Sequence, residues 1–93
     1  MAGDIDPFGL KMVYCIYMGD KMLEINEMTQ IAEVVRKTRK KQKVSQTILS
    51  QASNVGLRFV GDIERGKPSV QFDKLLAVLT TLGISLKLEL PQE

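Results

Sequence analysis

The segment that most constrains this chain runs from Ser45 to Gly66 and reads SQTILSQASNVGLRFVGDIERG. Serine is a preferred helix cap, and Asn54 and Gly66 are residue types that accept the left-handed backbone conformation with which many helices end. Between these signals the apolar residues recur at helical spacing. The segment therefore predicts two short helices, over residues 45–53 and 57–65, joined by a tight corner.

A longer helix is predicted on each side of this corner. An apolar stripe begins at Met28 and indicates a helix to about Lys41, with Asn26 or Thr29 as its cap. After the break at residues 66–68, a fourth helix is expected to be capped by Ser69 and to end at Gly83. The residues expected to face inward in the four helices are Met28, Ile31, Ala32 and Val35, then Ile48, Leu49 and Ala52, then Phe59, Val60 and Ile63, and finally Phe72, Leu75, Leu76, Leu79 and Leu82.

The composition excludes several kinds of active site. The chain has 93 residues, 44% of them hydrophobic, which supports one small domain with a single core. It has no histidine and one cysteine, Cys15, so a zinc finger, an intrachain disulfide and a histidine-based catalytic pair are excluded. P-loop and dinucleotide-binding glycine patterns are also missing. We therefore expect a protein that is not an enzyme and that binds no metal or cofactor.

The apolar segments of the chain are short. The longest apolar run, seven residues from Met12 to Met18, is far below the roughly 20 residues that span a bilayer. The first residues are acidic, unlike a secretion signal. We therefore expect a cytoplasmic protein that makes no membrane contact.

Positive charge is concentrated in the middle third of the chain. Residues 36–67 carry nine lysines and arginines against two acids, a local charge of +7, whereas residues 1–35 carry two lysines against six acids. A basic segment of this kind is the electrostatic footprint of a surface that lies on phosphates. Cations that favour the negative end of a solvated helix would give the same pattern. Charge alone leaves both interpretations open.

Two charged residues stand where the helical stripes require apolar side chains. Arg39 follows Val35 by four residues in the first helix, and Glu64 follows Val60 by four residues in the third. A buried charge without a partner is strongly destabilising. The sequence therefore predicts a buried ion pair between Arg39 and Glu64. The alternative is that either helix ends early and leaves its charge in solvent.

Six residues of these helices together form a family pattern: Arg39, Gln46, Leu49, Glu64, Arg65 and Gly66. The pattern resembles the Xre, or lambda-repressor-like, helix-turn-helix family, and the match covers residues 28–83. The resemblance implies a mainly α fold, a bundle of four or five helices whose third helix enters the major groove of DNA. It also implies that Arg39 pairs with Glu64 and that Gln46 lies beside the DNA backbone. The chain departs from the family at Ser50, Asn54 and Gly56, where Ala, Gly and a Ser or Thr cap are usual.

The run from Gly56 to Leu90 has a narrower resemblance, to antitoxins of the HipB type, which partner HipA-like kinase toxins. This resemblance implies a homodimer that represses its own toxin-antitoxin operon and holds the toxin inactive. One alternative is a stand-alone Xre-type repressor, such as a phage regulator or a restriction-modification controller. A further alternative is a protein-interaction module whose basic face binds an acidic partner instead of DNA.

The third helix is expected to read DNA with the face that turns away from its apolar stripe. Four residues lie on this face: Leu57, Arg58, Gly61 and Asp62. Arg58 is the expected principal base reader, because a guanidinium fork fits guanine O6 and N7. Asp62 is expected to accept from cytosine N4 or to orient Arg58, and Leu57 to touch a thymine methyl or to await a protein partner. Phosphate contacts are expected from Lys41, Lys43, Ser45, Gln46 and Lys67 and from the first amides of the second and fourth helices.

The C-terminal residues predict a strand. Its apolar residues, which alternate with polar ones, are Ile84, Leu86, Leu88 and Leu90. Such a strand needs a partner, either the same strand of a second subunit or residues 12–18 of its own chain. We favour the second subunit, because a twofold dimer has the symmetry of a palindromic operator. The expected organisation is an N-terminal extension (1–27, with a candidate short strand at 12–18), a DNA-binding domain (28–83) and a dimerisation strand (84–93).

Overall fold

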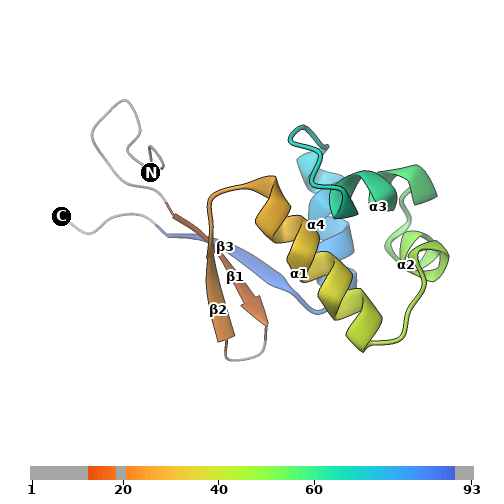
Figure 1. Ribbon diagram of the computed structural model, residues 1–93, viewed down its shortest axis with the longest axis horizontal. Helices are drawn as coiled ribbons and strands as arrows, with labels where there is room; N and C mark the ends of the chain where they lie inside the picture. Colours follow the sequence, from red (N-terminus) through yellow and green to blue (C-terminus); the bar gives the residue numbers. More distant parts are fainter. Residues whose placement is uncertain (1–12, 19–20, 90–93) are drawn as a thin grey trace.

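The computed structural model describes residues 13–18 and 21–89. Its elements are β1 (Val13–Met18), β2 (Lys21–Ile25), α1 (Met28–Lys41), α2 (Gln46–Ser53), α3 (Leu57–Glu64), α4 (Phe72–Thr81) and β3 (Ser85–Glu89). The helices form one bundle, and the strands form a small sheet at the end of the bundle opposite α2 (Figure 1). The mainly helical fold expected from the sequence is confirmed. Within the described residues, the helices are too short and too polar to cross a membrane.

The start of α1 differs in detail from the prediction. Glu27 precedes the first turn, and its backbone N–H donates to the side-chain oxygen of Gln30 at 3.0 Å, as in a capping box. The expectation that Asn26 or Thr29 caps this helix is therefore wrong. Thr29 already lies inside the helix, and Asn26 lies one residue too early. The helix ends at Lys41, as expected.

The corner between α2 and α3 follows the signals in the sequence. The Ser45 hydroxyl caps α2 by accepting a hydrogen bond from the backbone N–H of Ile48 at 3.1 Å. Asn54 ends α2 in the left-handed conformation, with φ 58°, and Gly66 follows α3 with φ 76°. A Cβ at Gly66 would also lie 3.1 Å from the methyl group of Thr29. Glycine is therefore required at this position by both conformation and space.

α4 begins two residues later than the predicted cap at Ser69 implies. It starts at Phe72, and the residue before it, Gln71, has an extended backbone with φ −70° and ψ 122°. Val70 explains this difference, because its side chain packs against the hydrophobic core and so keeps the chain out of a helix until Gln71. The helix gives way to Gly83 with φ 79°, as expected.

α2 packs through a face different from the one predicted. It buries Leu49, Ser50 and Ser53, whereas Ile48 and Ala52 are exposed. The Ser53 hydroxyl donates to the carbonyl of Leu49 at 2.6 Å, and the Ser50 hydroxyl also donates within the helix. Because both hydroxyls are satisfied locally, the serines can be buried, and the helix turns Ile48 outward.

α4 likewise turns two of its predicted core residues to the surface. Phe72 and Leu76 are exposed, while Leu75, Val78 and Leu79 are buried. Val78 was not on the predicted stripe. Five consecutive leucine, alanine and valine positions fit more than one stripe, and packing against α2 and β3 selects the buried one.

The sheet has the strand order β2–β1–β3, with both pairings antiparallel. In the central strand β1, Ile16 lies opposite Leu23 of β2 and Leu86 of β3. Of the two partners considered for β3, the structure shows the strand of its own chain, and pairing with a second subunit stays a prediction. The physical reason is the core, because Ile16 and Ile25 of the hairpin are buried together with Ile84. The expected residues Met12 and Leu90 lie outside the described part.

Candidate nucleic-acid interface

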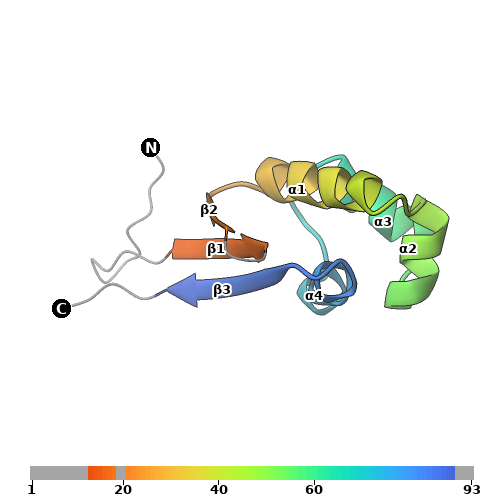
Figure 2. The ribbon, with the colours of Figure 1, turned by 90° about the horizontal axis from the view of Figure 1, so that it is seen from below.

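The inner face of α3 fixes this helix to the bundle. Val60 and Ile63 are fully buried, and Phe59 packs against the core. α2 and α3 lie at the end of the bundle away from the sheet, as Figures 1 and 2 both show. The opposite face of α3 is therefore presented to solvent at one end of the molecule.

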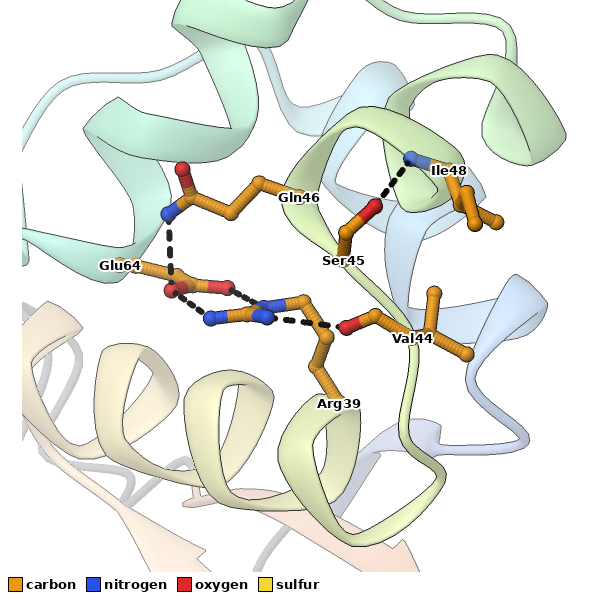
Figure 3. Close-up of polar contacts among 6 residues, drawn as sticks. All are labelled: Arg39, Val44, Ser45, Gln46, Ile48 and Glu64. Carbon is orange, nitrogen blue, oxygen red and sulfur yellow. Dashed lines mark hydrogen bonds and ion pairs between the residues drawn. The ribbon is translucent and has the colours of Figure 1, made fainter.

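An ion pair joins α1 to α3 (Figure 3). Arg39 Nε donates to Glu64 Oε2 at 2.6 Å, and Arg39 Nη2 donates to Glu64 Oε1 at 3.1 Å. Nη1 of the same arginine donates to the carbonyl of Val44 at 2.9 Å, and the Gln46 amide donates to Glu64 Oε1 at 3.0 Å. The side chains of Arg39 and Glu64 are only 11% and 6% exposed. This buried pair holds together α1, the loop before α2, α2 itself and α3.

Burial and hydrogen bonding act in opposite directions on Glu64. Burial alone would raise the pKa of its carboxyl group, but the hydrogen bonds from Arg39 and Gln46, with the charges of Arg39 and Arg36, outweigh burial and lower that pKa. The hydrogen bond to Glu64 raises the pKa of Arg39 against the effect of burial. Both groups are therefore charged at neutral pH. Their role is to fix the orientation of α3.

Five residues form the outer face of α3: Leu57, Arg58, Gly61, Asp62 and Arg65. The spacing of 3.6 residues per turn places them opposite the buried stripe. Leu57 is 50% exposed. Arg58 is also exposed, and no described residue forms a hydrogen bond or ion pair with its guanidinium group.

Asp62 is paired with residues that follow it in the chain. Its carboxylate forms an ion pair with the guanidinium group of Arg65 and a second with Lys67 Nζ at 3.7 Å. The Asp62 side chain is 16% exposed, whereas that of Arg65 is 68% exposed. Asp62 was expected to orient Arg58. In the structure its two carboxylate oxygens face Arg65 and Lys67 instead.

The residues expected to contact phosphates lie around the start of α2 and the end of α3. Lys41 and Lys43 are exposed, and Lys43 has a left-handed backbone with φ 60°. Ser45 uses an oxygen lone pair to cap α2, and no described residue accepts its hydroxyl hydrogen. Gln46 gives one amide hydrogen to the buried pair and keeps the other. Lys67 is exposed beside the outer face of α3.

Comparison with known proteins agrees with this geometry. Residues 35–88 match the family model described as helix-turn-helix. The chain belongs to the helix-turn-helix family. The match covers the helix-turn-helix unit of α2 and α3, both residues of the buried pair, and the chain through most of β3. The chain is also 44% identical over 69 residues to an uncharacterised HTH-type transcriptional regulator, y4mF, of Sinorhizobium fredii (strain NBRC 101917 / NGR234), an alignment that covers 74% of this chain and 91% of that protein.

Arg65 is an exposed residue beside the outer face of α3 for which the sequence predicts no DNA contact. In the sequence it contributes only to the family pattern. A signal was available, because Arg65 follows Arg58 by seven residues, close to two helical turns. Both arginines therefore share the outer face of α3.

Proposed function

We propose that this protein is a sequence-specific DNA-binding repressor that acts as the antitoxin of a HipA-type kinase toxin-antitoxin operon. Its membership of the helix-turn-helix family supports a DNA-binding transcriptional regulator, and the name of the Sinorhizobium relative is in keeping with that function. The antitoxin role is supported by the resemblance of residues 56–90 to HipB-type proteins. The observation that carries the DNA-binding proposal is the outer face of α3, which is exposed while its inner face is locked by the Arg39–Glu64 pair.

Arg58 is the proposed principal base reader. It lies in the first turn of α3, and the first turn of a recognition helix is the part that reaches base edges. Its guanidinium group has no partner among the described residues, so its paired donors are available for guanine O6 and N7. Leu57 beside it is proposed to contact a thymine methyl. Gly61 is not proposed as a base contact, because the Arg65 guanidinium group covers it. Asp62 is the weakest of the proposed base readers because Arg65 and Lys67 already occupy its carboxylate.

The cations around α3 are proposed to set the register on the phosphate backbone. Lys41 and Lys43 lie before α2, and Lys67 lies after α3. Ser45 and Gln46 each keep a hydrogen that a phosphate oxygen can accept, next to the first amides of α2. These contacts add affinity to every duplex and carry no direct sequence information.

Two copies of the chain are proposed to pair through β3, and the resulting homodimer is proposed to bind a palindromic operator. β3 is hydrogen-bonded to β1 on one side, and within the described residues no strand covers its other edge. An edge of free N–H and C=O groups pairs readily with another strand, and β3 of a second copy would supply one across a twofold axis. Ile84 is buried and Leu86 half-buried in the core of their own chain, so Leu88, at 46% exposed, is the side chain left for this contact. Leu90 lies outside the described residues.

A HipA-like kinase is the proposed protein partner. The outer face of α4, where Phe72 and Leu76 are exposed, is the proposed surface for it, because exposed apolar side chains grouped on one face mark interaction sites. The stand-alone repressor stays a second candidate, since the outer face of α3 supports DNA binding with or without a toxin.

Two measurements test the proposed function. Selection of duplexes from a random pool, followed by fluorescence anisotropy across a range of salt concentrations, is expected to give one preferred palindrome and a steep loss of affinity with salt. A protein-interaction module would instead show no preference among duplexes. Co-expression with a HipA-like kinase encoded beside the gene is expected to give a stable complex and to relieve kinase toxicity. A preferred operator with no such complex identifies a stand-alone repressor.

A further inference from the structure

We propose that Asp62 is a positioning residue that holds the Arg65 guanidinium group across the bare backbone of Gly61, so that Arg65 grips a DNA phosphate at the C-terminal end of α3. The proposal rests on the DNA-binding function proposed above. It assigns separate roles to three neighbouring residues: Gly61 gives space, Asp62 gives orientation and Arg65 makes the contact.

The space beside Gly61, where other residues have a Cβ, is filled by the side chain of Arg65. A Cβ built at Gly61 would lie 3.1 Å from Arg65 Nη1 and 4.0 Å from Arg65 Cζ. The backbone of Gly61 has no positive φ, so conformation does not require glycine there. Glycine inside a helix costs about 0.5–1 kcal/mol relative to alanine. An alanine here would press on the Arg65 guanidinium group, the flexible end of an exposed side chain, and would displace it from its place over the helix. Glycine therefore leaves the space in which the guanidinium group lies.

Asp62, the residue after Gly61, forms an ion pair with Arg65 on the outer face of α3. The two residues are three apart, a spacing that brings side chains together on a helix surface. The second carboxylate oxygen of Asp62 faces Lys67 Nζ at 3.7 Å. Exposed pairs of this kind contribute little to folding stability. Because Arg65 is 68% exposed, the part of its guanidinium group that does not face Asp62 is open to solvent.

The position of Arg65 on the helix favours a phosphate over a base. Seven residues at a rise of 1.5 Å each place it about 10 Å from Arg58 along the helix axis. Because the first turn of a recognition helix enters the groove, the last turn lies nearer to the DNA backbone. A guanidinium fork fits the oxygens of a phosphate in a bidentate manner. Arg65 is thus placed to anchor the end of α3 while Arg58 reads bases at its start.

The test compares Asp62→Asn, Gly61→Ala, Arg65→Ala and the double variant Asp62→Asn/Arg65→Ala in the full-length chain. Anisotropy titrations use the duplex selected by the wild-type protein and a scrambled duplex, over a range of salt. Thermal unfolding is measured in parallel. Glu33→Gln is the control, because Glu33, at 56% exposed, is a carboxylate paired with a cation on its own helix, Lys37.

The direction of the Asp62→Asn effect decides the matter. Removing a negative charge beside DNA should tighten binding if charge alone acts, whereas loss of positioning should weaken it several-fold on both duplexes. We expect Asp62→Asn to weaken binding with an unchanged melting temperature. Gly61→Ala should weaken binding with an unchanged or higher melting temperature, because alanine favours the helix. Glu33→Gln should not weaken binding. Arg65→Ala is expected to weaken binding about tenfold and to reduce the salt slope by about one. In the Arg65→Ala background only the charge effect remains, so Asp62→Asn should no longer weaken binding there.

Two results would overturn the proposal, and they are distinguishable. If the wild-type protein binds duplexes but Asp62→Asn or Gly61→Ala binds them as tightly or more tightly, positioning by Asp62 is wrong and DNA binding stands. If the wild-type protein binds no duplex at all, the proposed function fails and this inference fails with it.

Discussion

α3 carries an arginine-carboxylate pair on each of its two sides, and the two pairs differ in almost every respect except their chemistry. On the inner side Glu64 meets Arg39 of α1 in a nearly solvent-free contact that also includes Val44 and Gln46. On the outer side Asp62, at 16% exposed, meets Arg65, the 68% exposed residue that follows the last turn of the same helix. The inner pair links distant parts of the chain, whereas the outer pair orients one side chain over its own helix.

The difference teaches how burial sets the role of an ion pair. Breaking a buried pair leaves one uncompensated charge in the core, which is strongly destabilising. Breaking an exposed pair returns both charges to water at little cost. Changes on the inner side of α3 should therefore act on stability, and changes on the outer side should act on DNA binding at constant stability.

Arg39→Met is expected to have the largest effect, because it leaves the Glu64 carboxylate buried without its partner. We expect a loss of about 3–5 kcal/mol in the free energy of unfolding, measured by urea denaturation followed by circular dichroism. Arg39→Met/Glu64→Gln serves as control and should recover part of this loss by removing the buried charge. A near-neutral Arg39→Met combined with a costly Glu64→Gln would show that the pair does not hold α3.

Acid should weaken the Arg39–Glu64 pair gradually, whereas the substitution Arg39→Met removes it at once. The pKa of Glu64 is lower in the folded chain than in the unfolded chain, so the unfolded chain binds more protons in acid. The contribution of Glu64 to stability is full above an unfolded pKa of about 4.3 and is lost as the pH falls through its folded pKa. Melting temperatures between pH 7 and pH 3 should fall more steeply for the wild-type protein than for Glu64→Gln. Parallel declines would contradict the pKa direction assigned to Glu64.

Arg58→Ala should act on the outer side alone. The expected loss is about 1–3 kcal/mol of discrimination between the preferred operator and variants changed at one base pair, with an unchanged melting temperature. Arg58→Lys is the informative control, because it keeps the charge but not the guanidinium fork. It should retain general affinity and lose discrimination. Equal discrimination by wild type and Arg58→Ala would remove Arg58 as the base reader.

Lys43→Ala should have the smallest and least selective effect. Loss of one phosphate contact should weaken binding to all duplexes alike and reduce the slope of log affinity against log salt by about one. Lys37→Gln removes the same charge from α1, where the lysine already pairs with Glu33 at 3.2 Å, and should change this slope less. A change in operator preference with Lys43→Ala would place this lysine near base edges and not at the backbone.

The sequence by itself determined the features that depend on near neighbours or on the cost of an isolated charge. Ser45, Asn54 and Gly66 mark the ends of α2 and α3, because capping and left-handed φ are properties of single residues. Arg39 and Glu64 each stood on an apolar stripe, and a partner of opposite charge is the remedy for a buried charge. The family resemblance rested on this pair together with four further residues, Gln46, Leu49, Arg65 and Gly66, and the family model matches residues 35–88.

Only the tertiary structure decided the features in which several local solutions have similar energies. An eight-residue helix fits more than one apolar stripe, so packing selected the serine face of α2 and left Ile48 outside. The alternation of β3 required a partner strand but did not identify it, because any free edge satisfies backbone hydrogen bonds. Asp62 has an arginine within one turn on either side, and the space over Gly61 is where the structure places Arg65. Sequence spacing fixes which residues share a face, whereas packing fixes which of them touch.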